Sequence, residues 1–144
     1  MITIPYTPDL WKNSYTGKEK TIYKPLINAF LIANHKVGKA TPCYLDSGAS
    51  VNLSPAEYAL VFLGFSEKSL KRSGSPLDLQ GIGGITKTAY GHRCDLHSSD
   101  FRLENIMVYF LEGHKQPLLG RLDFMDKFKQ IVFNEDKKCI EIIR

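Results

Sequence analysis

Short apolar runs separated by polar turns dominate the chain from Pro25 onward. Residues 26–34 form a run that is apolar on both faces, and residues 40–45 return after a turn containing Gly38, which predicts a β-hairpin. Residues 101–110 alternate apolar and polar side chains, and two more apolar runs end the chain at 131–133 and 139–143. So many short strands predict a mainly β fold, either a small closed barrel or a sandwich.

Two segments favour helices instead. Ser54, Pro55 and Glu57 have the order of a capping box, which predicts a short helix over 58–62 that ends near Gly64. The pattern LDFMDKF predicts a second helix over 122–128. Between them, residues 68–76 are charged and contain glycine and serine, which predicts a loop.

Residues 1–24 differ from the rest of the chain. They are mostly polar and are interrupted by Pro5 and Pro8, so they predict an N-terminal extension of uncertain structure. Residues 25–144 are then one domain, in keeping with a length of 144 residues.

Composition narrows the classes of function. The net charge is only +4 and the lysines are scattered, whereas a nucleic-acid-binding protein usually carries a denser basic stripe. No apolar run approaches the ~18 residues of a membrane span. Three widely spaced cysteines, Cys43, Cys94 and Cys139, argue against a disulfide framework and predict a reducing, cytoplasmic location. Residues 92–97 hold two histidines, a cysteine and an aspartate but have no partner pair elsewhere, so we expect an ordinary strand and no metal or cofactor.

Three short motifs carry candidate chemistry. Asp46-Ser47-Gly48 is by itself a common turn, but it follows an apolar strand, where a partly desolvated carboxylate is a functional candidate. The glycines of 81–84 lie between residues 77–80 and 85–90, which predicts a hairpin over 77–90 with the glycines at its tip. Their spacing matches neither a dinucleotide-binding fingerprint nor a P-loop. The segment is either a plain hairpin or a lid whose backbone can approach an extended ligand closely. Leu118-Leu119-Gly120-Arg121 is compatible with a core strand that turns into a helix.

Taken in order, these motifs resemble the retroviral-type aspartic proteases, or retropepsins, and their single-domain cellular relatives. Residues 25–27 match the first core hairpin, and 44–50 match the motif apolar-apolar-Asp-Thr/Ser-Gly-Ala. Residues 79–84 match the flap hairpin, and 118–121 match apolar-apolar-Gly-Arg. The chain departs from the family at Ser50, where retroviral members often have an aspartate that pairs with the arginine. Residues 1–24 and 67–76 have no clear counterpart.

The resemblance implies a fold and an activity. The fold is a small closed acid-protease barrel with a flap hairpin and short helices. The activity is peptide-bond hydrolysis by a pair of Asp46 carboxylates, one from each chain of a homodimer, with an extended peptide as substrate and no cofactor. Implied catalytic residues are Asp46, Ser47 and Gly48. Implied substrate-binding residues are Ala49, Ser50, Gln80, Gly81, Ile82, Gly83, Gly84 and Ile85. Implied supports of the site are Leu119, Gly120 and Arg121.

Two other functions remain open at this point. The same barrel, catalytically silent, is a dimerisation or peptide-binding module. A basic β-barrel that binds nucleic acid is the third alternative, and no feature of the sequence requires it.

Overall fold

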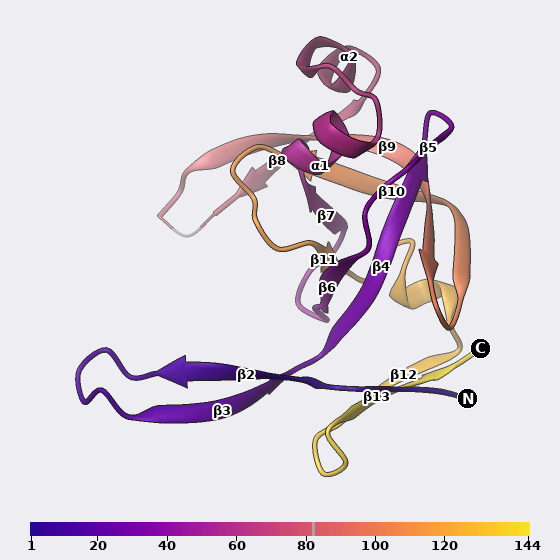
Figure 1. Ribbon diagram of the computed structural model, residues 1–144. Coiled ribbons are helices and arrows are strands. Elements are labelled where there is room, and N and C mark those ends of the chain that lie inside the picture. Colours follow the sequence, from indigo (N-terminus) through magenta and orange to yellow (C-terminus); the bar gives the residue numbers. More distant parts are fainter. Residues whose placement is uncertain (82) are drawn as a thin grey trace.

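The structure, a computed structural model, describes residues 1–81 and 83–144 (Figure 1). The strands are β1 (Ile2–Pro5), β2 (Thr7–Lys12), β3 (Glu19–Lys24), β4 (Leu26–Ala33), β5 (Lys36–Val37), β6 (Thr41–Leu45), β7 (Asn52–Pro55), β8 (Ser75–Gln80), β9 (Thr86–Ser98), β10 (Arg102–Leu111), β11 (Leu118–Leu119), β12 (Gln130–Asn134) and β13 (Cys139–Ile143). The helices are α1 (Ala56–Phe62), α2 (Glu67–Arg72) and the 3-10 turn η1 (Met125–Lys127). Within the described residues, no helix is long and apolar enough to cross a membrane.

Six strands close a barrel in the order β4-β6-β11-β7-β10-β9, because β4 pairs with β9 as well as with β6. The β10–β7 and β11–β6 pairings are parallel, and the remaining neighbours in the barrel are antiparallel. The predicted hairpin over 26–45 is confirmed as β4 and β6. The closed barrel confirms the mainly β fold class and decides against a sandwich.

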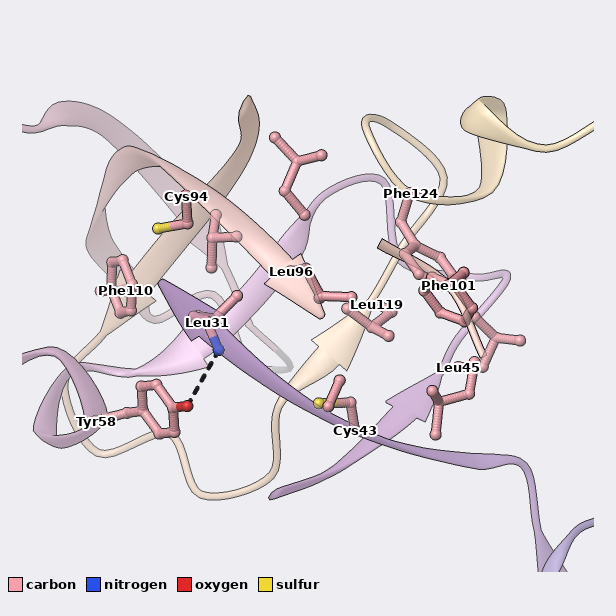
Figure 2. Packing of buried hydrophobic residues seen from close by; sticks show 14 of the residues in the cluster. Leu31, Cys43, Leu45, Tyr58, Cys94, Leu96, Phe101, Phe110, Leu119 and Phe124 are labelled. Carbon is pink, nitrogen blue, oxygen red and sulfur yellow. Dashed lines mark hydrogen bonds between the residues drawn. The ribbon is translucent and has the colours of Figure 1, made fainter. Parts of the chain in front are cut away.

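The barrel interior is filled by alternate residues of its strands (Figure 2). Ile106, Val108 and Phe110 on β10 are all buried, as the alternation predicts. At one end Phe101, Phe124 and Phe128 pack as a trio with ring centroids 5.3–5.8 Å apart. Each such buried side chain contributes about 1.5–3 kcal/mol.

The first predicted helix is confirmed as α1, but its predicted capping box is wrong. Ser54 is buried in β7 opposite Phe110, and Pro55 caps α1 without a side-chain bond. The capping box of this region lies one helix later, where Ser66 and Ser69 exchange side-chain and backbone bonds at the start of α2. The loop predicted over 68–76 is therefore also wrong, since α2 and the start of β8 occupy it.

The helix predicted over 122–128 is wrong as well, because the segment forms only the short turn η1. Asp123 takes a left-handed conformation, with φ of 65°, that ends any helix there. Its carboxylate accepts a hydrogen bond from the Met107 amide at 2.8 Å, and Phe124 is turned into the aromatic trio. These tertiary contacts override the local helical pattern.

Residues 1–24, whose structure the sequence leaves open, are mostly strands. β1 pairs with β13, which pairs with β12, and the three make a separate sheet beside the barrel. β2 and β3 form a hairpin of their own that projects from the body of the molecule (Figure 1).

Candidate active site

Asp46 follows the last residue of β6, which lies between β4 and β11 in the barrel. Its amide donates to the Leu119 carbonyl at 3.0 Å, so the ladder with β11 continues to the aspartate. Its carboxylate Oδ1 accepts from the Gly48 amide at 2.9 Å, and its carbonyl accepts from the Ala49 amide. The half-buried carboxylate is thus held at the start of a tight turn whose Ser47 and Gly48 are exposed.

Arg121 clamps this turn from the neighbouring segment. Its amide donates to the Ala49 carbonyl at 3.0 Å, and its side-chain Nε donates to the Ser47 carbonyl at 3.0 Å. The next amide, of Leu122, donates to the Ser50 carbonyl at 3.0 Å. The Arg121 side chain is therefore held by a backbone carbonyl, and Ser50, whose side chain is exposed, does not pair with it.

Gly120 lies where only a glycine fits. A Cβ at this position would lie 2.5 Å from the Val51 carbonyl oxygen and 2.7 Å from that of Ala49. The segments 46–51 and 119–121 are therefore in direct contact, and the structure brings these two predicted parts of the site together.

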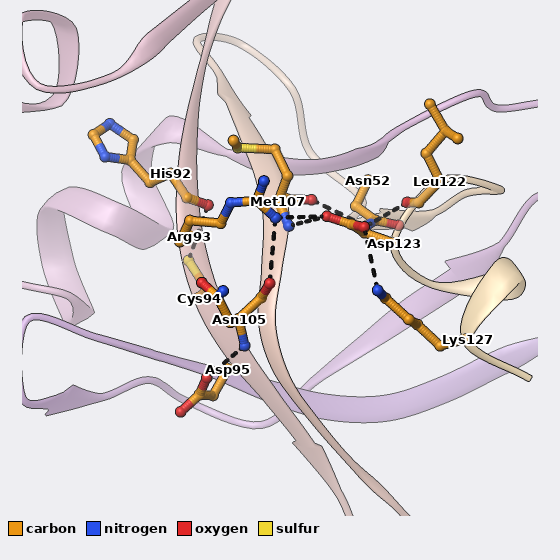
Figure 3. Close-up of polar contacts among 10 residues, drawn as sticks. All are labelled: Asn52, His92, Arg93, Cys94, Asp95, Asn105, Met107, Leu122, Asp123 and Lys127. Carbon is orange, nitrogen blue, oxygen red and sulfur yellow. Dashed lines mark hydrogen bonds and ion pairs between the residues drawn. The ribbon is translucent and has the colours of Figure 1, made fainter.

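Asn52 is a supporting residue that the sequence analysis missed. Its buried side chain donates from Nδ2 to the Met107 and Leu122 carbonyls, both at 3.1 Å, and accepts from the Gly120 amide at 2.8 Å. It thereby joins three chain segments behind the Asp46 turn (Figure 3). The available signal was one polar residue between Val51 and Leu53, directly after the motif.

A charged cluster extends this support outward (Figure 3). Asp123 accepts from the Met107 amide at 2.8 Å and pairs with Arg93 Nη1 at 3.0 Å and Lys127 Nζ at 3.6 Å. The Met107 hydrogen bond, followed by the charges of Lys127 and Arg93, outweighs partial burial and lowers the pKa of Asp123. The turn that follows Arg121 is fixed to β9 and β10 in this way.

The predicted hairpin over 77–90 is confirmed as β8 and β9, paired from Ser75↔Gly91 to Gln80↔Thr86. Its tip closes through the Gly81 amide, which donates to the Ile85 carbonyl at 2.9 Å. Ile85 is 66% exposed, and Ile82 lies outside the described residues. Within the described part of the chain no hydrogen bond joins this tip to the Asp46 turn, so the two parts of the predicted site are separate here.

The histidine- and cysteine-containing segment 92–97 lies in β9 as a barrel strand. His92 Nε2 bonds to the Leu70 carbonyl at 2.7 Å, His97 packs on Phe30, and Cys94 is buried. Among the residues described, no three His, Cys, Asp or Glu side chains gather as a metal site. The three cysteines are buried free thiols, and burial raises the pKa of Cys43 and Cys94 to about 12.

No protein-family model and no curated protein matches the chain. Among solved structures, it is similar to a retropepsin-like aspartic protease from Rickettsia conorii, with a TM-score of 0.63 and 23% sequence identity. The match covers 99% of this chain and 97% of that one. The likeness establishes that the fold is of the retropepsin-like aspartic protease type.

Proposed function

We propose that the protein is an aspartic endopeptidase whose active site forms between two copies of the chain. Residues 25–144 are the protease domain. The substrate is a peptide segment in extended conformation, and no cofactor takes part. The buried free thiols suit a reducing compartment such as the cytoplasm.

The proposed chemistry needs two carboxylates that share one proton. The ionised Asp46 takes a proton from the attacking water, and the protonated Asp46 of the second copy polarises the scissile carbonyl. The pair titrates as a unit. Asp-Ser-Gly occurs once in the sequence, and a two-fold axis places the same residue opposite itself, so a homodimer supplies both groups.

The observation that carries this proposal is the rigid placement of Asp46. Its turn is tied to β11 by the Leu119 carbonyl, to Arg121 by one amide and one side-chain hydrogen bond, and to Leu122 by one amide hydrogen bond. A catalytic group has to be held close to its productive position, which such bracing favours. The distant structural relative that is a retropepsin-like aspartic protease has the same fold.

The remaining proposed site residues surround this pair. Ser47 lies beside the axis, where its hydroxyl would bond across to the second copy, while Gly48, Ala49 and Ser50 offer backbone groups to the peptide. The hairpin tip over 80–85, which includes Ile82, would cover a peptide that adds as a strand. Leu119, Gly120 and Arg121 support the turn from behind.

The test is Asp46→Asn, which keeps the size of the side chain but removes the ionisable group. Peptide-library hydrolysis and self-cleavage, both followed by mass spectrometry, should fall to background. The matched control is Asp136→Asn, since Asp136 is an exposed aspartate in the β12–β13 turn and should leave cleavage unchanged.

Hydrolysis that survives Asp46→Asn would refute the assignment. A wild-type protein that binds extended peptides and cleaves none would instead support the silent peptide-binding module.

A further inference from the structure

The β2–β3 hairpin, residues 7–24, is an arm that stands away from the barrel (Figure 1). Among the described strands, β2 and β3 pair with each other and with nothing else. Every residue of β2 is exposed, and β3 has no buried residue. A two-stranded hairpin alone is marginally stable in water, so an arm of this kind is expected to have a packing partner.

The base of the arm is fixed at both ends. Tyr6, just before β2, is buried; its amide donates to the Lys138 carbonyl at 2.8 Å and its hydroxyl donates to Glu135 at 3.0 Å. Just after β3, the Pro25 carbonyl accepts from the Leu45 amide at 2.9 Å. Leu45 precedes Asp46, so the direction of the arm is tied to the proposed catalytic turn.

The tip of the arm is ordered as well. Asn13 Oδ1 accepts hydrogen bonds from the amides of Tyr15 and Thr16, at 2.9 and 3.1 Å. The Asn13 amide donates to the Lys18 carbonyl, and Gly17 takes a left-handed conformation that closes the turn. The tip therefore presents its side chains in one arrangement before any partner binds.

The tip and the strands of the arm expose large apolar side chains. Tyr15 at the tip is 97% exposed, Leu10 is 61% exposed, and Trp11 and Tyr23 are 48% and 47% exposed. Trp and Tyr are the residues that most often dominate the binding energy of protein interfaces. An exposed group of this kind marks an interaction surface.

The position of the arm indicates which partner it contacts. In Figure 1 the arm and the β8–β9 hairpin extend toward the same side of the view, with the β6–β7 loop between them. That loop carries Asp46, and in the proposed dimer the two Asp46 carboxylates lie about 3 Å apart. Both arms then start close to the two-fold axis, and each six-residue strand spans about 20 Å. An arm of that length, directed toward the face that holds the axis, reaches the other subunit.

We propose that the β2–β3 arm is a dimerisation arm, which packs Trp11 and Tyr15 against a second copy of this chain. This inference rests on the proposed shared active site and adds the surface that holds the two copies together. By symmetry each subunit gives one arm and receives one. The arm then keeps the two catalytic turns together independently of the substrate.

The experiment measures the dimer dissociation constant by sedimentation over a wide concentration range, using full-length Asp46→Asn protein so that self-cleavage cannot intervene. Trp11→Ser and Tyr15→Ser should each raise the dissociation constant roughly 10- to 100-fold. The control Val61→Ser removes a 70% exposed apolar side chain from α1 and should leave it unchanged. Because Tyr15 is almost fully exposed, its loss cannot act through folding, and an unchanged thermal unfolding curve verifies this.

A dissociation constant unaffected by both arm variants overturns the inference. The inference is also overturned if the Asp46→Asn protein without an arm substitution stays monomeric. The lysines of the arm also suit a nucleic acid, so arm variants that lose only binding to a single-stranded oligonucleotide overturn it as well. Peptide hydrolysis by protein with an intact Asp46, measured in parallel, separates the two proposals. Hydrolysis with arm-independent dimers refutes the arm alone, whereas arm-dependent dimers without hydrolysis refute the enzyme alone.

Discussion

The turn that carries Asp46 and the tip of the β8–β9 hairpin are both glycine-containing connections between strands, but they are held very differently. Arg121, Leu122 and the Gly120 backbone support the turn from an adjacent segment, and Asn52 locks that segment in place. The tip is held by bonds within itself, between Gly81 and Ile85 and between Gly84 and Gly81. Among the described residues, the turn is supported by neighbouring segments of the barrel, whereas the hydrogen bonds of the tip stay within its own hairpin.

This difference matches what each connection would do in a peptidase. A reacting carboxylate has to stay in place, whereas a cover over a peptide has to open for substrate and close again. Glycine has a different role in each of the two connections. At Gly120 the missing side chain allows close backbone packing, and at Gly83, with φ of 89°, it allows a left-handed backbone in open space.

The largest loss of stability is expected when the tight space beside Gly120 is filled. Gly120→Ala would place a methyl group against the carbonyls of Val51 and Ala49, which are backbone atoms that cannot turn aside. Overpacking typically costs 1–3 kcal/mol and occasionally more, so we expect a loss of about 3 kcal/mol or more in the free energy of unfolding. Urea unfolding measures this loss, and a variant too unstable to fold would fail to accumulate as folded protein.

Gly83→Ala is the matched variant in the hairpin tip. A Cβ there would meet nothing within 4 Å, so the cost is the left-handed backbone alone, about 1 kcal/mol, with the fold intact. Equal losses in the two variants would mean that the turn and the tip are not held differently after all.

The sequence predicts most of the turn and little of what supports it. Alternation predicts β10, and the resemblance to retropepsins implies that the Gly-Arg motif supports the Asp-Ser-Gly turn, in keeping with the contact between segments 119–121 and 46–51. The prediction of a helix over 122–128 fails because the Asp123 carboxylate is held by the Met107 amide of β10, a contact between distant parts of the chain that no local pattern reveals. The sequence does not predict the β2–β3 arm, because both faces of β2 are exposed and its sequence therefore lacks the alternation of apolar and polar residues that marks a strand.

Asn52→Leu tests the support of the turn from within the core. Leucine is of similar size but leaves two carbonyls and the Gly120 amide without their partners in a buried place. An unsatisfied buried group costs about 1–3 kcal/mol, and partial relaxation is expected, so we predict a loss of roughly 2–4 kcal/mol. Urea unfolding is the measurement, and Leu53→Asn, on the neighbouring half-buried position, controls for a polar–apolar exchange in the same strand. A stability within error of wild type would show that the turn does not depend on Asn52.

An effect no larger than that of Gly83→Ala is expected at Asp123, on the outer side of the same support. Asparagine tolerates the left-handed backbone and can still accept from the Met107 amide, but it loses the charge that faces Arg93 and Lys127. We expect Asp123→Asn to cost about 1 kcal/mol at neutral pH, since both ion pairs are partly exposed.

The pH dependence of that loss identifies its cause. The pKa of Asp123 is lowered in the folded protein, so its charge stabilises the fold above the ordinary pKa of an aspartate and ceases to do so as the pH falls through the lowered value. The difference between wild type and variant should therefore be largest near neutral pH and shrink in acid, as followed by urea unfolding across pH. Asp126→Asn, an exposed neighbour in η1, should show no such trend. A deficit that stays constant down to acid pH would assign the effect to the shape of the turn instead of its charge, and would confine the rigid support of Asp46 to the uncharged contacts around Asn52 and Gly120.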